Sequence, residues 1–416
     1  MTGKTPPTAD AANFDGPYPF ITIPDLDGRR VIDRAGRTLS KKGAEAMRSC
    51  LLPPGAVMMS CIATVGKCGV TAKPSFTNQQ INSVIPSDKT ESGFLYYVFA
   101  QLGHELESAG GGGSVYTNVS KSRFSDIEIS LPDDVNEQRA IAHILGTLDD
   151  KIELNRRMNE TVEAMARAMF ESWFVNFHPV RAKMEGRWRL GQSFAGLPAH
   201  LYDLFPDRLE DSELGEIPRG WNVRSIGEVV RCVGGSTPST EEPKYWEGGT
   251  NPFVTPKDMS SLTSPVILGT ERQMTDAGLE RISSGRLPVG TVLLSSRAPI
   301  GYLAITEVPA SVNQGIIAMI CEGELPKHYV LRWVETNMEI IKANAGGTTF
   351  AEINKRNFRP IPVIVPPQKT LSGFVQQVQP LHQRIVMNVK ETKILAGLRD
   401  ALLPKLISGE IRLRSR

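Results

Sequence analysis

The chain has 416 residues, a formal net charge of +2 and the composition of an ordinary soluble globular protein. This length predicts two or three domains, each large enough to bury a core of its own. No apolar run approaches the ~18 residues of a membrane span, and residues 1–13 are polar rather than a signal core, so we expect a cytoplasmic protein.

The five cysteines and six histidines form no metal-binding pattern. None of the cysteine spacings matches a Cys-x-x-Cys or a Cys/His zinc site, so buried free thiols are expected. The histidines are scattered without ligand spacing, which favours structural or surface roles. We therefore predict no metal site. The cysteines are Cys50, Cys61, Cys68, Cys232 and Cys321.

An internal repeat with an offset of 233 to 235 residues runs through the chain. Pro19–Thr22 returns as Pro252–Thr255, and Asn78-Gln79 returns as Asn313-Gln314. A single repeat of this length indicates a duplicated domain rather than a solenoid of short units. Because the Asn-Gln pair is the same in both copies, we interpret it as structural, bonding backbone in a turn.

Each copy reads as a mixed α/β globule, with short β-branched segments broken by Gly and Pro. The predicted strands are 56–63, 82–86 and 126–131 in the first copy, and 291–296, 300–306 and 315–321 in the second. Helices are expected at 93–106 and 326–343, where apolar residues recur at three and four.

A seven-residue repeat follows each copy, with gaps that alternate between four and three, and it predicts a long helix with a seam for a partner helix. The first helix, expected over 138–177, would be a rod of roughly 60 Å. Pro380 should kink the second helix and Pro404 should disturb its last turns. The seam residues are Ile141, Leu145, Leu148, Ile152, Asn155, Asn159, Val162, Met169 and Trp173 in the first, and Phe374, Val378, Leu381, Ile385, Asn388, Leu395 and Leu402 in the second.

These patterns divide the chain into five parts. A first globular domain spans 1–133, a central helix 134–177, a connecting loop or appendage 178–215, a second globular domain 216–367 and a C-terminal helix 368–416. The second copy opens with a lead-in, Glu216–Cys232, that has no counterpart before Gly3. Either the first domain lacks its opening segment, or the start of this chain is not the ancestral one.

No motif for catalysis or for a nucleotide was found. Gly110–Gly113 is not followed by the Lys-Ser/Thr of a phosphate-binding loop. Asn251-Pro252-Phe253 lacks one proline of the aminomethyltransferase element, and no nuclease carboxylate pattern is complete. We therefore predict no catalytic residue in this chain.

Polar residues that suit base edges and phosphates recur after the same elements in both copies. A plain surface role is the alternative for each of them, and the small net charge decides nothing, because a DNA footprint depends on clustering. The candidates are Lys67, Ser114, Tyr116, Asn118, Lys121 and Arg123 in the first copy, and Arg297, Thr348, Thr349, Asn354, Lys355, Arg356 and Arg359 in the second.

Several segments resemble the specificity subunit of type I restriction-modification enzymes. They are Asn136–Ala142, Leu148–Asn155, Phe170–Phe174, Gly215–Trp221 and Leu402–Ile411. The resemblance covers nearly the whole chain. It implies two duplicated α/β target-recognition domains, separated by two long antiparallel coiled-coil helices in a pseudo-twofold body, that read a bipartite target on double-stranded DNA. It departs at the front, where the lead-in is missing.

The same resemblance implies that type I methyltransferase (modification) subunits dock on each side, with a restriction or translocase subunit as a further partner. S-adenosylmethionine and ATP would belong to those partners, and this chain would hold no cofactor. Two other interpretations remain open at this point. One is a methyltransferase or nuclease in its own right, and the other is a coiled-coil scaffold without a DNA role.

Overall fold

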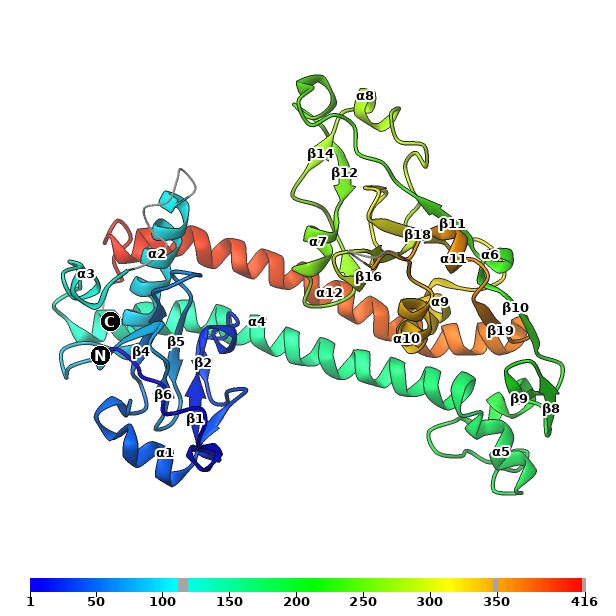
Figure 1. Ribbon diagram of the computed structural model, residues 1–416, viewed down its shortest axis with the longest axis horizontal. Coiled ribbons are helices and arrows are strands. Elements are labelled where there is room, and N and C mark those ends of the chain that lie inside the picture. Colours follow the sequence, from blue (N-terminus) through cyan, green and yellow to red (C-terminus); the bar gives the residue numbers. More distant parts are fainter. Residues whose placement is uncertain (111–118, 347–350, 414–416) are drawn as a thin grey trace. The chain divides into compact units, whose positions relative to one another are not determined.

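A computed structural model describes residues 1–110, 119–346 and 351–413 of the chain. The chain divides into two compact units (Figure 1). Unit 1 combines Met1–Leu154 with Glu391–Arg416, and unit 2 is Asn155–Lys390. The two long helices, α4 (Val135–Phe170) and α12 (Gln368–Ile407), each contribute one section to each unit.

The globule of unit 1 holds two small sheets. The four-stranded sheet has the order β2-β5-β4-β7 and the three-stranded sheet the order β3-β1-β6. The strands are β1 (Phe14–Ile21), β2 (Val31–Ile32), β3 (Thr38–Leu39), β4 (Val57–Ser60), β5 (Cys68–Thr71), β6 (Phe76–Thr77) and β7 (Ile81–Val84). The helices are α1 (Lys41–Ala46), α2 (Ser92–Gly110) and α3 (Lys121–Ser125).

The globule of unit 2 repeats both sheets. The order β13-β16-β15-β18 matches β2-β5-β4-β7, and β14-β12-β17 matches β3-β1-β6. The parallel pairing Val31↔Val70 becomes Val266↔Ile305, at an offset of 235 on both strands. The matched strands are β12 (Asn251–Val254), β13 (Val266–Ile267), β14 (Gln273–Met274), β15 (Val292–Ser296), β16 (Ile300–Thr306), β17 (Ser311–Val312) and β18 (Ile316–Ile320). The predicted duplication into two mixed α/β domains is confirmed.

Unit 2 also holds elements beyond the repeat and several short helices. The additional strands are β8 (Leu209–Ser212), β9 (Gly215–Pro218), β10 (Asn222–Ser225), β11 (Arg231–Gly234) and β19 (Pro362–Val365). The helices are α5 (His178–Met184), α6 (Ile226–Val229), α7 (Pro256–Ser260), α8 (Asp276–Leu279), α9 (Lys327–Thr336), α10 (Met338–Ala343) and α11 (Lys355–Phe358). The predicted helix 326–343 is therefore two helices, with Asn337 between them.

One sequence-predicted strand is wrong. Residues 126–131 form no strand, whereas their counterpart β19 pairs with β10 of the lead-in segment. The physical reason is the ladder partner: none of the described strands of unit 1 lies beside 126–131, so their backbone groups have no ladder to join. Likewise, β11 pairs with the edge of β18, while the matching edge of β7 carries the isolated bridge Thr2↔Asn82.

Both prolines expected to disturb the second long helix lie inside it. The helix α12 is continuous from Gln368 to Ile407, across Pro380 and Pro404. A proline lacks the N–H donor and its ring crowds the carbonyl four residues earlier, but packing of the neighbouring turns can hold the helix together. The first long helix ends as predicted in the aromatic segment: α4 is followed by a π-helical turn, Glu171–Val175, and Phe177 adopts a left-handed conformation with φ of 51°.

The predicted seam residues are all buried or half-buried in the structure. In unit 2, Asn388 Nδ2 donates to Asn159 Oδ1 at 2.8 Å, and Asn159 Nδ2 donates to Ser264 Oγ at 3.1 Å, so the polar seam positions bond to each other and to the globule. Phe374 of α12 packs against Phe170 and Trp173. The α4 and α12 sections are antiparallel within each unit, because rising residue numbers in one pair with falling numbers in the other.

The predicted connecting segment 178–215 is a packed appendage. Trp188, Leu197, Leu201 and Phe205 are buried in the main core of unit 2, together with residues of α4 and α12. The segment ends in the β8–β9 hairpin. Its apolar residues are spaced without helical or strand periodicity, which is why the sequence left both a loop and an appendage open.

The Asn-Gln pairs have the predicted structural role. Asn78 Oδ1 accepts the backbone N–H of Gln80, and Asn313 Oδ1 accepts that of Gly315. The following glutamine accepts a hydroxyl in both copies: Thr5 donates to Gln79 at 2.7 Å and Thr237 donates to Gln314 at 2.6 Å. The identical residues therefore fix the same turn twice.

Buried polar contacts tie each globule to its sections of the long helices. In unit 1, Asp149 of α4 accepts the hydroxyl of Tyr97 (α2) at 2.6 Å and a guanidinium N–H of Arg399 (α12) at 2.7 Å. We call these three residues the unit-1 tie. Burial first, then the charge of Asp149 and its hydrogen bond, raise the pKa of Tyr97, so its hydroxyl keeps the proton that it donates.

The unit-2 tie has two parts. Arg332 of α9 pairs with Glu163 of α4, and its side chain is only 6% exposed. His382 of α12 donates to Glu307 at 2.8 Å, next to the β16 end, and Lys327 lies 3.1 Å from the same carboxylate oxygen. Burial alone would raise the pKa of Glu307, but the bonds from His382 and Lys327 lower it to about 2. Glu163, Arg332, Glu307 and His382 form the unit-2 tie.

His328, beside the unit-2 tie, makes the stability of unit 2 depend on pH. Burial, reinforced by His382, Lys327 and Arg332, lowers its pKa to about 3 from 6.5. The folded-state pKa is the lower one, so this stabilisation is complete above 6.5 and is lost as the pH falls toward 3. We expect the free energy of unfolding to fall by about 1 kcal/mol more between pH ~6 and ~5 in the native chain than in His328→Leu.

Urea titrations followed by tryptophan fluorescence measure this difference, because all five tryptophans lie in unit 2. Glu307 does not interfere, since its depressed pKa places its own loss of stabilisation between 4.5 and about 2. If the free energy of unfolding fell equally with pH in the native chain and in His328→Leu, the prediction would be contradicted.

No helix among the described residues is long and apolar enough to cross a membrane.

Candidate nucleic-acid interface

In unit 2, Arg297 and the start of α11, which carries Lys355 and Arg356, lie around the end of β15. Ile353 N–H donates to the carbonyl of Ser296 at 3.0 Å, which brings the segment before α11 against the β15–β16 turn. Arg297 lies on that turn and forms a backbone bridge with Glu352. Two residues after Ile353, α11 begins at Lys355.

Unit 1 has the same arrangement at the end of β4. Val119 N–H donates to the carbonyl of Cys61 at 2.8 Å, the counterpart of the Ile353 bond. Lys67 follows on the β4–β5 turn, and α3 begins at Lys121, the equivalent of Lys355 at an offset of 234. Phe124 and Phe358 are buried at matching positions, which directs the lysine that opens each short helix to the surface.

Four of the candidate cations are exposed and have no ion-pair partner among the residues that the structure describes. A surface lysine or arginine without a carboxylate partner can neutralise a phosphate without first breaking another pair. These residues are Lys67, Lys121, Lys355 and Arg356, two in each unit. Arg123, in α3, is exposed as well.

Three other candidates already have structural contacts. Arg359 donates to the carbonyl of Cys232 at 2.6 Å, which joins α11 to β11. Arg297 pairs with Glu352 at 3.7 Å. Asn354 Oδ1 accepts the N–H of Asn357 as the N-cap of α11. DNA contacts by these residues stay predictions, and Arg359 is the one whose structural role is clearest.

Ser114, Tyr116, Asn118, Thr348 and Thr349 lie outside the described residues. Their predicted contacts with DNA stay predictions.

A duplicated arginine–aromatic stack was missed by the sequence reasoning. Arg37 lies 4.4 Å from the ring centroid of Phe14, and Arg272 lies 3.9 Å from that of Trp246. Both arginines are exposed, and their carbonyls accept equivalent bonds from Phe20 and Phe253. A guanidinium stacked on a ring keeps its N–H edge available for phosphate or guanine. The offset of 235 between Arg37 and Arg272 was the signal that could have revealed the pair.

The structure offers no metal centre in the part of the chain that it describes: no group of three or more His, Cys, Asp or Glu side chains is placed to hold an ion. The cysteines are free thiols, and four of the five are buried. Burial raises the pKa of Cys232 to about 11, so this thiol stays protonated and unreactive.

The family model for the type I restriction modification DNA specificity domain matches residues 1–164 and 218–394 of the chain. These two matches cover the two repeats described above. The chain therefore belongs to the specificity subunits of type I restriction enzymes.

Curated relatives agree with this assignment. The specificity subunit of the type I restriction enzyme MjaIX from Methanocaldococcus jannaschii is 28% identical over 99% of this chain and 90% of its own length. The HindI specificity subunit from Haemophilus influenzae is 28% identical over 71% of this chain and 72% of its own length. Among solved structures, a type I restriction-modification S subunit from M. genitalium covers 100% of this chain and 94% of its own, with a TM-score of 0.51 and 16% identity.

Proposed function

We propose that this specificity subunit reads a bipartite target on double-stranded DNA, one half-site with each globular domain. The duplicated surface at the ends of β4 and β15 carries this proposal. In each unit, the same backbone bond places a short lysine-led helix beside a strand turn, with two exposed cations that no described carboxylate pairs. Two equivalent surfaces in one chain suit two half-sites, because repeated protein units read repeated DNA elements.

The chain is proposed to contribute recognition and no chemistry. Type I methyltransferase subunits would dock on it and supply S-adenosylmethionine and the methyl transfer, and a restriction or translocase subunit would supply ATP-driven steps. The charged side chains near the candidate surfaces are surface cations and structural pairs, and the buried carboxylates Asp149, Glu163 and Glu307 are all engaged with basic or hydroxyl groups. Such paired carboxylates are suited to holding the fold.

Co-expression with the neighbouring methyltransferase subunit in a methylation-free host, followed by long-read mapping of N6-methyladenine, tests the proposal. We expect methylation at one split motif. Its two halves should be separated by a spacer of constant length whose bases can be any sequence. A continuous motif, or no new methylation despite a stable complex, would contradict it.

Controls separate recognition from catalysis. The purified chain incubated with S-adenosylmethionine and DNA should transfer no methyl group, whereas the complex should. Replacing residues of one globule, for example Lys355 and Arg356 with glutamine, should weaken methylation at the whole motif, because both half-sites are needed for binding.

A further inference from the structure

Two residues of each tie that joins a globule to the long helices occupy equivalent positions in the two units. Tyr97 on α2 corresponds to Arg332 on α9 at the offset of 235, and Asp149 on α4 corresponds to His382 on α12 at the offset of 233. All four side chains are buried or nearly so and engaged in polar contacts. Two separate sites have therefore kept a polar tie at the same place but with different chemistry.

The two ties use different side chains, although the packing of the helices and the globule would not require them to differ. In unit 1, an acid on α4 joins a tyrosine of the globule and an arginine of α12. In unit 2, the globule supplies both an arginine for the acid on α4 and an acid for the histidine on α12. Buried polar groups of this kind add little net stability, but they favour one geometry strongly, because any other leaves a charge buried without a partner.

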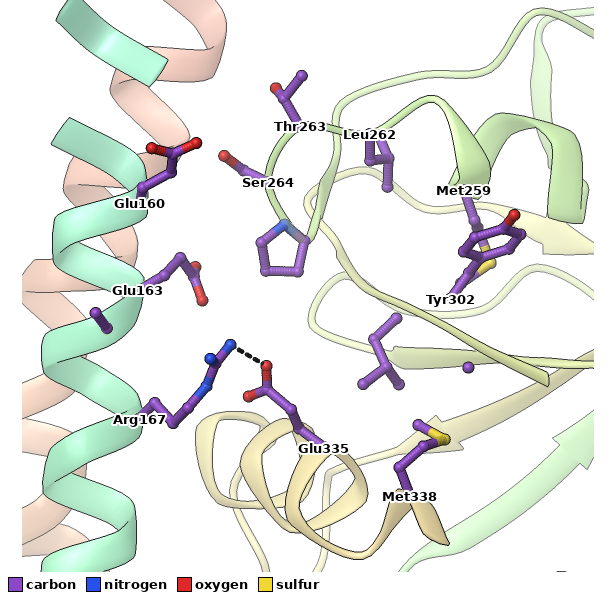
Figure 2. A pocket seen from close by; sticks show the side chains of 14 residues that line it. Glu160, Glu163, Arg167, Met259, Leu262, Thr263, Ser264, Tyr302, Glu335 and Met338 are labelled. Atoms are coloured by element: carbon purple, nitrogen blue, oxygen red, sulfur yellow. Dashed lines mark hydrogen bonds and ion pairs between the residues drawn. The ribbon is translucent and has the colours of Figure 1, made fainter. Parts of the chain in front are cut away.

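Open space lies beside part of each tie. In unit 2, a groove of about 600 Å³ lies between α4 and one part of the globule. Glu163 of the tie lines it, together with Arg167 and Glu335. Figure 2 shows Arg167 of α4 reaching across to Glu335 of α9, with Glu163 on the same helix face. In unit 1, Tyr97, Asp149 and Arg399 themselves line a groove of about 940 Å³.

The two grooves are equivalent as well. On the globule side, Gly66 lines the unit-1 groove and Gly301 the unit-2 groove, at an offset of 235. On the helix side, Asp400 of α12 lines the unit-1 groove and Arg167 of α4 the unit-2 groove, at an offset of 233. A close-packed contact would resist tilting through the shape of its side chains. Along the grooves this packing is absent, so there the polar ties add to the resistance that the aromatic core of unit 2 provides elsewhere.

We propose that the two ties are positioning residues that fix the angle of each recognition domain on the long helices and thereby restrict the enzyme to one spacer length. The inference rests on the proposed reading of a bipartite target. One base pair of extra spacer moves a half-site by about 3.4 Å and turns it by about 35° around the duplex axis. A domain held by the unit-1 or unit-2 tie cannot follow that displacement without separating buried charges.

Conservative variants weaken each tie while leaving its neighbours paired. Tyr97→Phe removes one hydroxyl and leaves Asp149 with Arg399, and Glu163→Gln leaves Arg332 with Glu335. In the complex with the methyltransferase subunit, we expect both to keep the native half-site sequences. Methylation at sites whose spacer differs by one base pair should rise about tenfold relative to the native spacer, which corresponds to about 1.4 kcal/mol.

Glu339→Gln is the matched control, because it removes an exposed carboxylate of the same globule whose partner is Lys342 on the same helix. It should leave the spacer preference unchanged. Plasmids that carry the native motif with the spacer shortened or lengthened by one base pair give the readout, and thermal unfolding checks that each variant is folded.

A folded variant of either tie with lower methylation but an unchanged spacer preference would overturn the inference, since a purely structural role predicts that result. The proposed function itself fails at an earlier step, if the native chain directs no split-motif methylation. The two failures are therefore distinguished by the native chain alone.

Discussion

Replacing Lys67, Lys121, Lys355 and Arg356 together with glutamine is expected to lower the slope of log affinity against log salt by about 3.6, close to 0.9 for each phosphate that is no longer neutralised. All four are exposed, and none has an ion-pair partner among the described residues, so each can neutralise a phosphate without breaking an internal pair. At ~0.15 M salt the same change weakens binding by about a thousandfold. Fluorescence anisotropy of a labelled duplex, titrated with the methyltransferase complex between ~50 and ~200 mM salt, measures both quantities.

A second set of four cations gives the matched control for this prediction. Each of these side chains pairs with a carboxylate on the surface, and two lie in each unit: Lys42, Arg48, Lys257 and Lys342. Their replacement with glutamine removes the same formal charge, so the long-range attraction of DNA falls equally. The salt slope should change by less than about 1. Equal effects of both sets would show that net charge, rather than the two surfaces, governs binding.

The pairs within the first set also test the duplication. Replacing only Lys67 and Lys121, or only Lys355 and Arg356, should each remove about half of the slope, close to 1.8. Because phosphate contacts carry no sequence information, the methylated motif should stay the same in both double variants. A change in the bases recognised would place these residues at base edges rather than at the backbone.

The sequence predicted the duplication because the same turns and helix caps need the same hydrogen-bonding residues in both copies. The capping pair Thr22 and Asp25 returns as Thr255 and Asp258. Thr71 and Thr306 each donate a hydroxyl to the proline carbonyl that precedes the equivalent strand. Such residues recur because the same backbone turn needs the same donor or acceptor, so identity at a fixed offset predicts identical local structure.

The ties and the arginine–aromatic stacks could not be found in the same way. Tyr97 and Arg332 occupy one structural position but are chemically different, and their partners lie far away in the sequence. Likewise, the β19 counterpart at 126–131 has the composition of a strand, and only the missing ladder partner decides against it. Local patterns predict turns, helices and seams, whereas pairing between distant elements depends on tertiary structure.

Phe374→Ala is expected to lower the free energy of unfolding of unit 2 by about 3–5 kcal/mol, the usual cost of truncating a buried phenylalanine. The Phe374 ring is fully buried on α12 and contacts three aromatic residues of α4 and the turn after it: Phe170, Trp173 and Phe174. These contacts join the two long helices where the cores of the helices and the globule merge, so the cavity would open at that junction. Urea denaturation followed by tryptophan fluorescence reports on unit 2 alone and measures the decrease.

Met387→Ala on the same helix is the control, because its side chain is 60% exposed and its removal should cost less than about 0.5 kcal/mol. Phe374→Ala should lower the free energy of unfolding more than Met387→Ala does. Both substitutions shorten an apolar side chain of α12, but only the Phe374 side chain faces α4. If Phe374→Ala and Met387→Ala cost the same, the junction of α4 and α12 would contribute no more than the free surface of the helix. In that case the long helices could not hold a recognition domain at the fixed angle that a constant spacer demands.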